Sequence, residues 1–162
     1  MLKSVKKQRG LYAALFLFVF ASLGSQHSLA QSASTQANVA QPTLPTMRLT
    51  AGMHIITAEV ASTPQTRERG LMFRKDLAPN HGMLFVFQSA SQQCFWMMNT
   101  LIPLSIAFIK DDGTIINIAD MKPLSKDNHC STEPARYALE MEQGWFAKRG
   151  INPGKQILGL PR

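Results

Sequence analysis

The sequence lacks the short motifs by which many enzyme classes are recognised. It contains no zinc-ligand pattern, no phosphate-binding loop, no nucleophile elbow and no dinucleotide-binding fingerprint. It has no internal repeat either. We therefore expect no cofactor and no metal centre of a familiar type, and function has to be inferred from the fold and from single polar residues on it.

The chain also lacks an apolar run long enough to span a membrane. Residues 11–23 are apolar apart from Ser22, but about 13 helical residues cover only about 20 Å of a hydrocarbon core about 30 Å thick. Four basic residues precede this run, and the small-x-small triplet at residues 28–30 follows it. This pattern predicts a signal peptide over residues 1–30 that is cleaved before Gln31, and an uncleaved anchor is the alternative.

No cysteine follows the apolar run at a plausible processing site, so nothing indicates a lipoprotein. We expect a periplasmic or secreted protein with no stable membrane span after cleavage.

A basic stripe is missing as well. The whole chain has a formal net charge of +7, but without residues 1–30 it keeps 13 basic and 10 acidic residues, a net charge of +3. The remaining charges are scattered and do not alternate with aromatic residues. We therefore expect no nucleic-acid partner.

Large apolar residues are scarce in residues 31–46, where only Val39 and Leu44 occur among Gln, Ser, Ala, Thr, Asn and Pro. Such a segment buries too little surface to offset its ordering entropy, which predicts a flexible linker. Residues 47–162 are enough for one small domain with one core.

Within this domain, short β-branched and apolar runs alternate with turns rich in glycine and proline. The best-marked hairpin spans residues 104–119, with a turn at Asp111-Asp112-Gly113. A short helix is expected at residues 65–69, capped by Thr63, and a helical turn at 144–149. The pattern predicts a mainly β domain, a compact antiparallel barrel or sandwich with one or two short helices. The predicted strands are residues 53–60, 83–87, 94–100, 104–110, 114–119, 135–142 and 155–160.

The two cysteines, Cys94 and Cys130, are expected to form a disulfide. An even number of cysteines in an exported domain favours a bridge, and closing a loop of this length stabilises by about 4 kcal/mol in the chain-entropy model. Two independent thiols are the alternative. A catalytic thiol is disfavoured, because no histidine is marked as a partner of Cys94.

The most informative stretch is residues 82–113, which contains the hexamer Phe-Trp-Met-Met-Asn-Thr at 95–100 followed by Ile-Pro-Leu at 102–104. Together with Gly-Leu-Met-Phe-Arg at 70–74, it resembles the bacterial and archaeal family called domain of unknown function 192. The resemblance runs from about residue 53 to 158 and implies a small β-sandwich or barrel. Three positions depart from the family pattern: Ser105 replaces an aspartate, Met98 a frequent lysine and Lys155 a commoner acidic residue.

Five residues are candidates for ligand contact. If residues 94–100 form a strand, Trp96, Met98 and Thr100 share one face and Asn99 lies on the other. Trp96 either stacks on a sugar or aromatic ligand or packs in the core. Asn99 either braces a loop or faces a cleft.

The other two candidates are charged. Arg74 either grips a carboxylate or phosphate or pairs with Glu140. Glu140, carried over from the family pattern, could act as a general acid or base if partly buried. No second carboxylate is placed by motif, so a paired-carboxylate glycosidase mechanism has no support.

Methionine is frequent, with eight in residues 31–162, and with His54, His81 or His129 these thioethers could bind Cu(I). Their spacing matches no metal motif, and methionine is also an adaptable core residue.

The leading hypothesis is a non-catalytic envelope module that binds a small polar ligand, a glycan or a protein partner. Its cleft would lie near Arg74, Trp96, Asn99, Thr100 and Glu140. One alternative is a hydrolase-type enzyme using Glu140 with Asn99 and Arg74, and another is soft-metal (copper) binding.

Overall fold

The computed structural model describes residues 38–162, so the predicted signal peptide lies outside the described residues. The described part is mainly β, as predicted, with one short α-helix and one 3-10 turn. Its elements in chain order are β1 (Thr46–Ala51), β2 (His54–Ala61), α1 (Pro64–Arg69), β3 (His81–Ser91), β4 (Cys94–Phe95), β5 (Leu104–Ile109), β6 (Ile115–Met121), β7 (His129–Cys130), β8 (Ala135–Glu142), η1 (Ala147–Arg149) and β9 (Ile157–Leu158).

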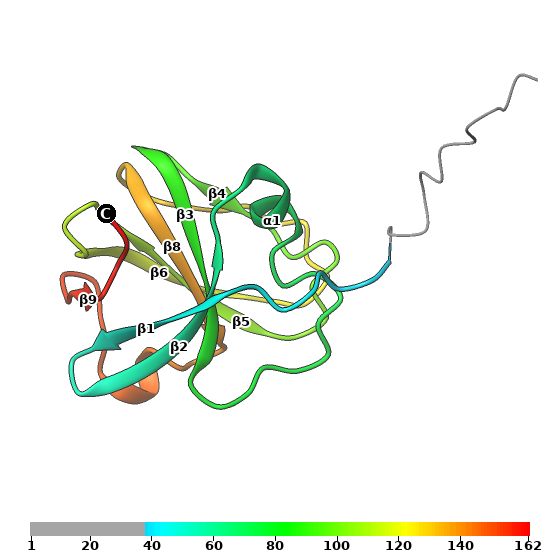
Figure 1. Ribbon diagram of the computed structural model, residues 1–162, viewed down its shortest axis with the longest axis horizontal. Coiled ribbons are helices and arrows are strands. Elements are labelled where there is room, and N and C mark those ends of the chain that lie inside the picture. Colours follow the sequence, from blue (N-terminus) through cyan, green and yellow to red (C-terminus); the bar gives the residue numbers. More distant parts are fainter. Residues whose placement is uncertain (1–37) are drawn as a thin grey trace, which may run out of the picture. The chain divides into compact units, whose positions relative to one another are not determined.

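Seven strands form one sheet in the order β6-β5-β8-β3-β2-β1-β9, and β4 pairs with β7 in a second, two-stranded sheet. Figure 1 shows β3 and β8 side by side near the centre of the large sheet. All pairs are antiparallel except β2 with β3, which are parallel. A parallel pair needs a long crossover, and residues 62–80, which include α1, provide it.

The large sheet curls into a half-barrel. Residues 154–158, near the C-terminus, lie between strand β1 and the start of strand β6. On one side β9 pairs with β1, with Leu158 opposite Thr50. On the other side the Ile115 N–H donates to the Lys155 carbonyl at 2.8 Å, and the Ile157 N–H donates to the Gly113 carbonyl at 2.9 Å. Residues 154–158 therefore cover exposed edge groups that would otherwise invite pairing with another chain.

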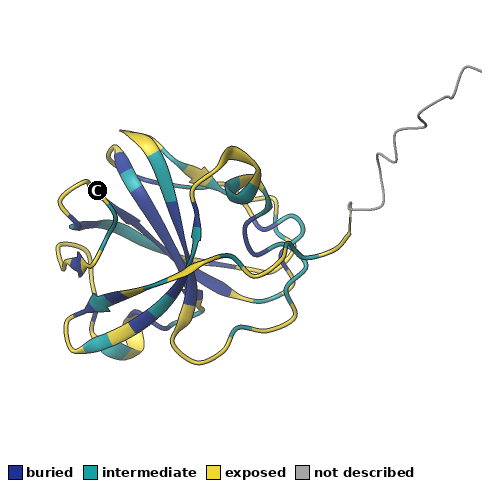
Figure 2. Ribbon diagram, viewed as in Figure 1, coloured by how far each residue is buried: buried dark blue, intermediate teal, exposed yellow. Residues whose placement is uncertain are grey.

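The sheet has a hydrophobic cluster on each face, and β8 contributes to both. Tyr137, Leu139 and Met141 belong to one cluster and Ala138 to the other, which is the alternation predicted for this strand. Figure 2 shows β8 as largely buried, whereas β3 is buried over residues 82–85 and exposed toward its C-terminal end. Glu140 shares the face of Ala138, so its carboxyl group points toward the cluster that contains Ala138, which we call the second cluster.

Several local predictions are confirmed. β5 and β6 form the expected hairpin, with Leu104 opposite Met121. α1 is capped by Thr63, whose hydroxyl accepts the Thr66 N–H, and Pro64 occupies the first turn. Cys94 and Cys130 are opposite each other in the β4–β7 pair and form the expected disulfide.

Two strands were not predicted, and two predicted strands are shorter than expected. The unpredicted ones are β1 and the two-residue β7, because residues 46–51 carry no clear apolar run and residues 122–134 are polar. The strand predicted over 94–100 ends at Phe95, since the Thr100 N–H donates to the Met97 carbonyl and closes a turn. The last strand is reduced to Ile157–Leu158, because residues 153–155 form a turn in which the Lys155 N–H donates to the Asn152 carbonyl.

Among residues 38–162, no helix is long and apolar enough to cross a membrane.

Candidate ligand-binding site

A cavity of about 620 Å³ opens on the second face of the sheet. α1, strands β3 and β8, and the loop of residues 96–100 provide its walls. Four of the five residues predicted for ligand contact line it: Trp96, Asn99, Thr100 and Glu140. We refer to this cavity as the Glu140 pocket.

The loop 96–100 is held by main-chain hydrogen bonds to two other segments. The Phe73 N–H donates to the Asn99 carbonyl at 2.9 Å, and the Met97 N–H donates to the Ser125 carbonyl at 2.9 Å. The Met97 side chain is fully buried in the second cluster and anchors the loop. Because the backbone turns here, side chains that a strand would place on opposite faces line the same pocket.

The disulfide fixes the start of this loop. Cys94 itself lines the Glu140 pocket, and its partner Cys130 lies in the two-residue strand β7, within the loop that follows β6. The Asn117 side chain of β6 donates to the Cys130 carbonyl at 3.1 Å and ties that loop to the sheet. The bridge thus connects the pocket wall to β6.

Glu140 is the most unusual residue of the pocket. Glu140 is only 4% exposed, and its cross-strand neighbours are the apolar Met83 on β3 and Ile106 on β5. Within residues 38–162 the structure shows no hydrogen bond or ion pair to its carboxyl group. Burial raises the pKa of Glu140 from 4.5 to about 8. At neutral pH the group is therefore mainly a neutral carboxylic acid that can donate one hydrogen bond.

Asn99 and Thr100 bring further polar groups that lack strong partners. The Asn99 amide nitrogen lies 3.7 Å from the Met72 sulfur, a weak acceptor. Neither the Asn99 side-chain carbonyl nor the Thr100 hydroxyl makes a hydrogen bond in the described part of the chain. The side-chain oxygens of Glu140, Asn99 and Thr100 thus line one pocket without a hydrogen-bond partner among residues 38–162.

Aromatic rings form the apolar part of the wall. Phe95 packs edge-on against Phe85, Phe87 and Phe108, at centroid distances of 4.9, 6.4 and 5.8 Å. Trp96 is 48% exposed, so it is not a core residue. Its indole face is available for stacking by a bound molecule.

α1 contributes charged residues that the sequence did not single out. The Arg67 guanidinium lies 5.4 Å from the centre of the Phe87 ring and donates to the Val86 carbonyl at 2.9 Å. Arg69 lies over Phe73 at 4.9 Å. Both arginines and Glu68 line the pocket. The only sequence signal was the polar composition of the predicted helix.

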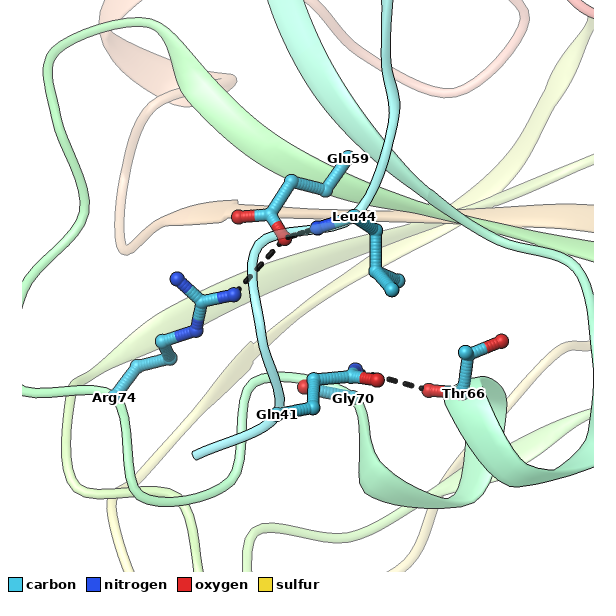
Figure 3. Close-up of polar contacts among 6 residues, drawn as sticks. All are labelled: Gln41, Leu44, Glu59, Thr66, Gly70 and Arg74. Atoms are coloured by element: carbon cyan, nitrogen blue, oxygen red, sulfur yellow. Dashed lines mark hydrogen bonds and ion pairs between the residues drawn. The ribbon is translucent and has the colours of Figure 1, made fainter. Parts of the chain in front are cut away.

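Arg74 lies apart from the other four predicted residues. Its guanidinium pairs with Glu59 at 2.9 Å, not with Glu140, and it lines a separate cavity of about 200 Å³. Figure 3 shows that the same Glu59 oxygen also accepts the Leu44 N–H, at 2.8 Å. The structure therefore does not bring Arg74 together with Glu140 and Asn99, as the hydrolase-type alternative requires.

Figure 3 also shows Gln41 reaching the end of α1, where its amide donates to the Thr66 and Gly70 carbonyls at 3.1 and 2.8 Å. Gln41 and Leu44 fall within residues 31–46, the segment predicted as a linker. These contacts hold the segment against α1 and β2.

Of the departures from the family pattern, Met98 lines the Glu140 pocket, whereas Ser105 does not. The buried Ser105 hydroxyl donates to the Asp120 carboxylate and accepts the Gly144 N–H at 2.8 Å, so it links β5, β6 and the segment after β8.

Four of the eight methionines in residues 31–162 are fully buried in the two clusters: Met83, Met97, Met121 and Met141. In the part of the chain that the structure describes, no group of three or more His, Cys, Asp or Glu could hold a metal ion.

Two solved structures resemble this chain closely in fold. A protein from Sinorhizobium meliloti 1021, named as a candidate transcription regulator, is 38% identical with a TM-score of 0.68, covering 72% of this chain and 95% of that one. A protein of unknown function from Novosphingobium aromaticivorans DSM 12444 is 32% identical with a TM-score of 0.68, covering 76% and 96%. No curated protein matches the chain significantly.

The family comparison agrees with the resemblance seen in the residues at 70–74 and 95–104. The family model DUF192, described as Uncharacterized ACR, matches residues 47–159, nearly all of the β domain. This chain belongs to the DUF192 family.

Proposed function

We propose that this protein is an exported, non-catalytic module that binds a small polar ligand or a glycan in the Glu140 pocket. One observation carries the proposal: Trp96, Asn99, Thr100 and Glu140 line one cavity, and three of them bring polar groups without an internal partner. These side-chain oxygens face the pocket and have no protein partner, so a ligand that hydrogen-bonds to them adds interactions that the protein alone does not make. The cavity volume also falls within the range of about 300–1,000 Å³ typical of small-molecule sites.

The composition of the pocket supports a molecule with both a polar and a flat or apolar part. Glu140 of β8, the loop 96–100 and the charged residues of α1 contribute the polar groups, whereas Phe85, Phe87 and Phe95 provide an apolar wall. Trp96, half exposed, offers a stacking face of the kind that sugar rings and aromatic rings use. A small ligand fits this concave site better than a flat protein surface does.

Export is the second part of the proposal. It is supported by the signal-peptide pattern of residues 1–30 and by a disulfide that forms and persists in oxidising compartments. We expect the protein recovered from the periplasm or medium to begin at Gln31 and to contain no free thiol. Intact-mass analysis with and without reduction measures both, and a chain that keeps residues 1–30 with free thiols contradicts export.

The binding proposal is tested by native mass spectrometry of the exported protein. We expect a small molecule or glycan to remain bound to the wild type and to be lost from the double variant Trp96→Ala/Asn99→Ala. Arg74→Ala is the matched control, because it removes a partly buried polar side chain from a separate cavity and should keep the ligand. Equal retention by the double variant would remove the Glu140 pocket as the binding site.

Tryptophan fluorescence provides an independent readout. The chain has two tryptophans, of which Trp96 is 48% exposed at the pocket and Trp145 only 2% exposed in the other cluster. Ligand binding should change the emission of Trp96 and leave that of Trp145 nearly constant. A response that persists in Trp96→Phe would place the ligand elsewhere.

A hydrolase-type enzyme is a second candidate, favoured by the raised pKa of Glu140, which keeps a proton available to a leaving group at neutral pH. It requires that Glu140→Gln retains ligand affinity and loses turnover. The binding proposal predicts that the wild type does not convert the retained ligand. Incubating that ligand with the protein and following the ligand mass therefore distinguishes a binding module from a hydrolase.

A further inference from the structure

We propose that the ligand of the Glu140 pocket carries a primary ammonium group that binds to Glu140, Asn99 and Thr100. This inference rests on the proposed function, because it names the chemical class of molecule that the pocket takes. It is carried by the number and kind of unpartnered groups and by the aromatic wall beside them.

Each of the three side chains that lack a strong partner offers an acceptor oxygen to the pocket. Glu140 offers carboxyl oxygens, Asn99 a side-chain carbonyl and Thr100 a hydroxyl, and none of these is hydrogen-bonded within residues 38–162. A primary ammonium has three N–H donors and no acceptor, so it can satisfy one oxygen of each residue. A hydroxyl has one donor and leaves acceptors unpaired, and a carboxylate or phosphate has no donor for them.

The charge of Glu140 points the same way. Its neighbours across the sheet, Met83 and Ile106, are apolar, and the loop 96–100 contributes only neutral side chains. Apart from Glu140, the ionisable groups that line the pocket come from α1: Arg67, Glu68 and Arg69. No cation from β3, β5 or the loop pairs with Glu140, so a ligand cation would supply the counter-charge that the protein itself does not.

The aromatic wall accepts cations. The Arg67 guanidinium already stacks over Phe87 on this wall, at 5.4 Å from the ring centre. Rings of this kind attract ammonium groups placed over their faces. The half-exposed Trp96 and the Phe95 cluster can therefore surround the carbon body of the ligand beside its charged end.

Binding is coupled to loss of one proton. The free pocket holds Glu140 mainly as a carboxylic acid at neutral pH, whereas an ammonium favours the carboxylate. When the charged ammonium binds, the Glu140 carboxyl group releases its proton to solvent. The resulting carboxylate and the bound ammonium have opposite charges, so charge balances. Affinity should therefore rise about tenfold per pH unit below the pKa of free Glu140, which is about 8.

The test uses two probes with the same body, 2-phenylethylamine and 2-phenylethanol, and isothermal titration calorimetry. With the wild type at about pH 8 we expect the amine to bind at least about tenfold more tightly than the alcohol. At about pH 6.5, titration in buffers of different ionisation enthalpy should show release of close to one proton per amine bound.

Glu140→Gln should bind both probes with similar affinity, and Glu142→Gln, which changes an exposed glutamate at the end of the same strand, should behave as the wild type. Equal affinity of the wild type for the two probes, amine binding without proton release, or no amine binding would each overturn the ammonium assignment. The proton measurement uses only wild-type protein, so it holds even if Glu140→Gln folds poorly. Ligand retention in native mass spectrometry tests the binding site independently. The ammonium assignment can therefore fail while the proposed function stands.

Discussion

Replacing Glu140 by glutamine should remove a pH dependence of stability that one buried carboxyl group imposes on the whole domain. In the unfolded chain this carboxyl ionises near 4.5, whereas burial keeps it protonated in the folded protein up to about pH 8. Between these values the unfolded state has fewer bound protons than the folded state. Rising pH therefore favours unfolding throughout this window.

The magnitude follows from the size of the shift. Each pH unit within the window lowers the free energy of unfolding by about 1.4 kcal/mol, so the full window corresponds to about 5 kcal/mol and the loss at pH 7 to about 3 kcal/mol. Glutamine has nearly the same shape and no charge. We expect Glu140→Gln to be similar to the wild type in stability near pH 4.5 and several kcal/mol more stable at pH 8.

Urea denaturation followed by circular dichroism, at several pH values from about 4.5 to 9, measures this difference. The comparison between the two proteins is decisive, because every other titrating group contributes equally to both. Glu142→Gln serves as the control, since its side chain is exposed and its pH profile should run parallel to that of the wild type. A stability difference between wild type and Glu140→Gln that stays constant with pH would refute the reasoning.

Three further changes test other parts of the structure. Gly82→Ala would place a Cβ 2.3 Å from the Glu140 carbonyl oxygen on the neighbouring strand. We expect the free energy of unfolding, measured by chemical denaturation, to fall by about 1–3 kcal/mol. A stability equal to that of the wild type would show that β3 and β8 are less closely packed than described. Reducing the Cys94–Cys130 bridge should lower the free energy of unfolding by up to about 4 kcal/mol, measured with and without a reductant, and an unchanged midpoint would contradict a structural role for the bridge. Arg74→Ala breaks a partly buried ion pair and should cost about 1–3 kcal/mol while leaving ligand retention intact, so a loss of ligand without a loss of stability would return this arginine to the binding site.

Local sequence signals were sufficient for the elements whose shape depends on neighbouring residues. The Asp111-Asp112-Gly113 turn with β-branched flanks predicted the β5–β6 hairpin, and Thr63 with Pro64 predicted the start of α1. The alternation along β8 also emerged as expected. These features depend on backbone preferences and periodicity, which act over a few residues.

The same periodicity was misleading at residues 94–100. Their β-rich composition indicates a strand, but the Met97 side chain is drawn into the second cluster and the backbone turns to place it there. The parallel pairing of β2 with β3 was equally out of reach, because it depends on where the crossover containing α1 lies. Tertiary packing overrode local propensity in both places.

The sequence by itself determined the family, the mainly β class, the disulfide partners and four of the residues that line the pocket, Trp96, Asn99, Thr100 and Glu140. Only the tertiary structure decided which of those residues meet. Arg74 pairs with Glu59 of strand β2. Glu140 lies between Met83 and Ile106, and its carboxyl group has no partner among residues 38–162. The physical reason is that a side chain's charge state and partners depend on neighbours contributed by distant strands, and no short-range pattern encodes which neighbours those are.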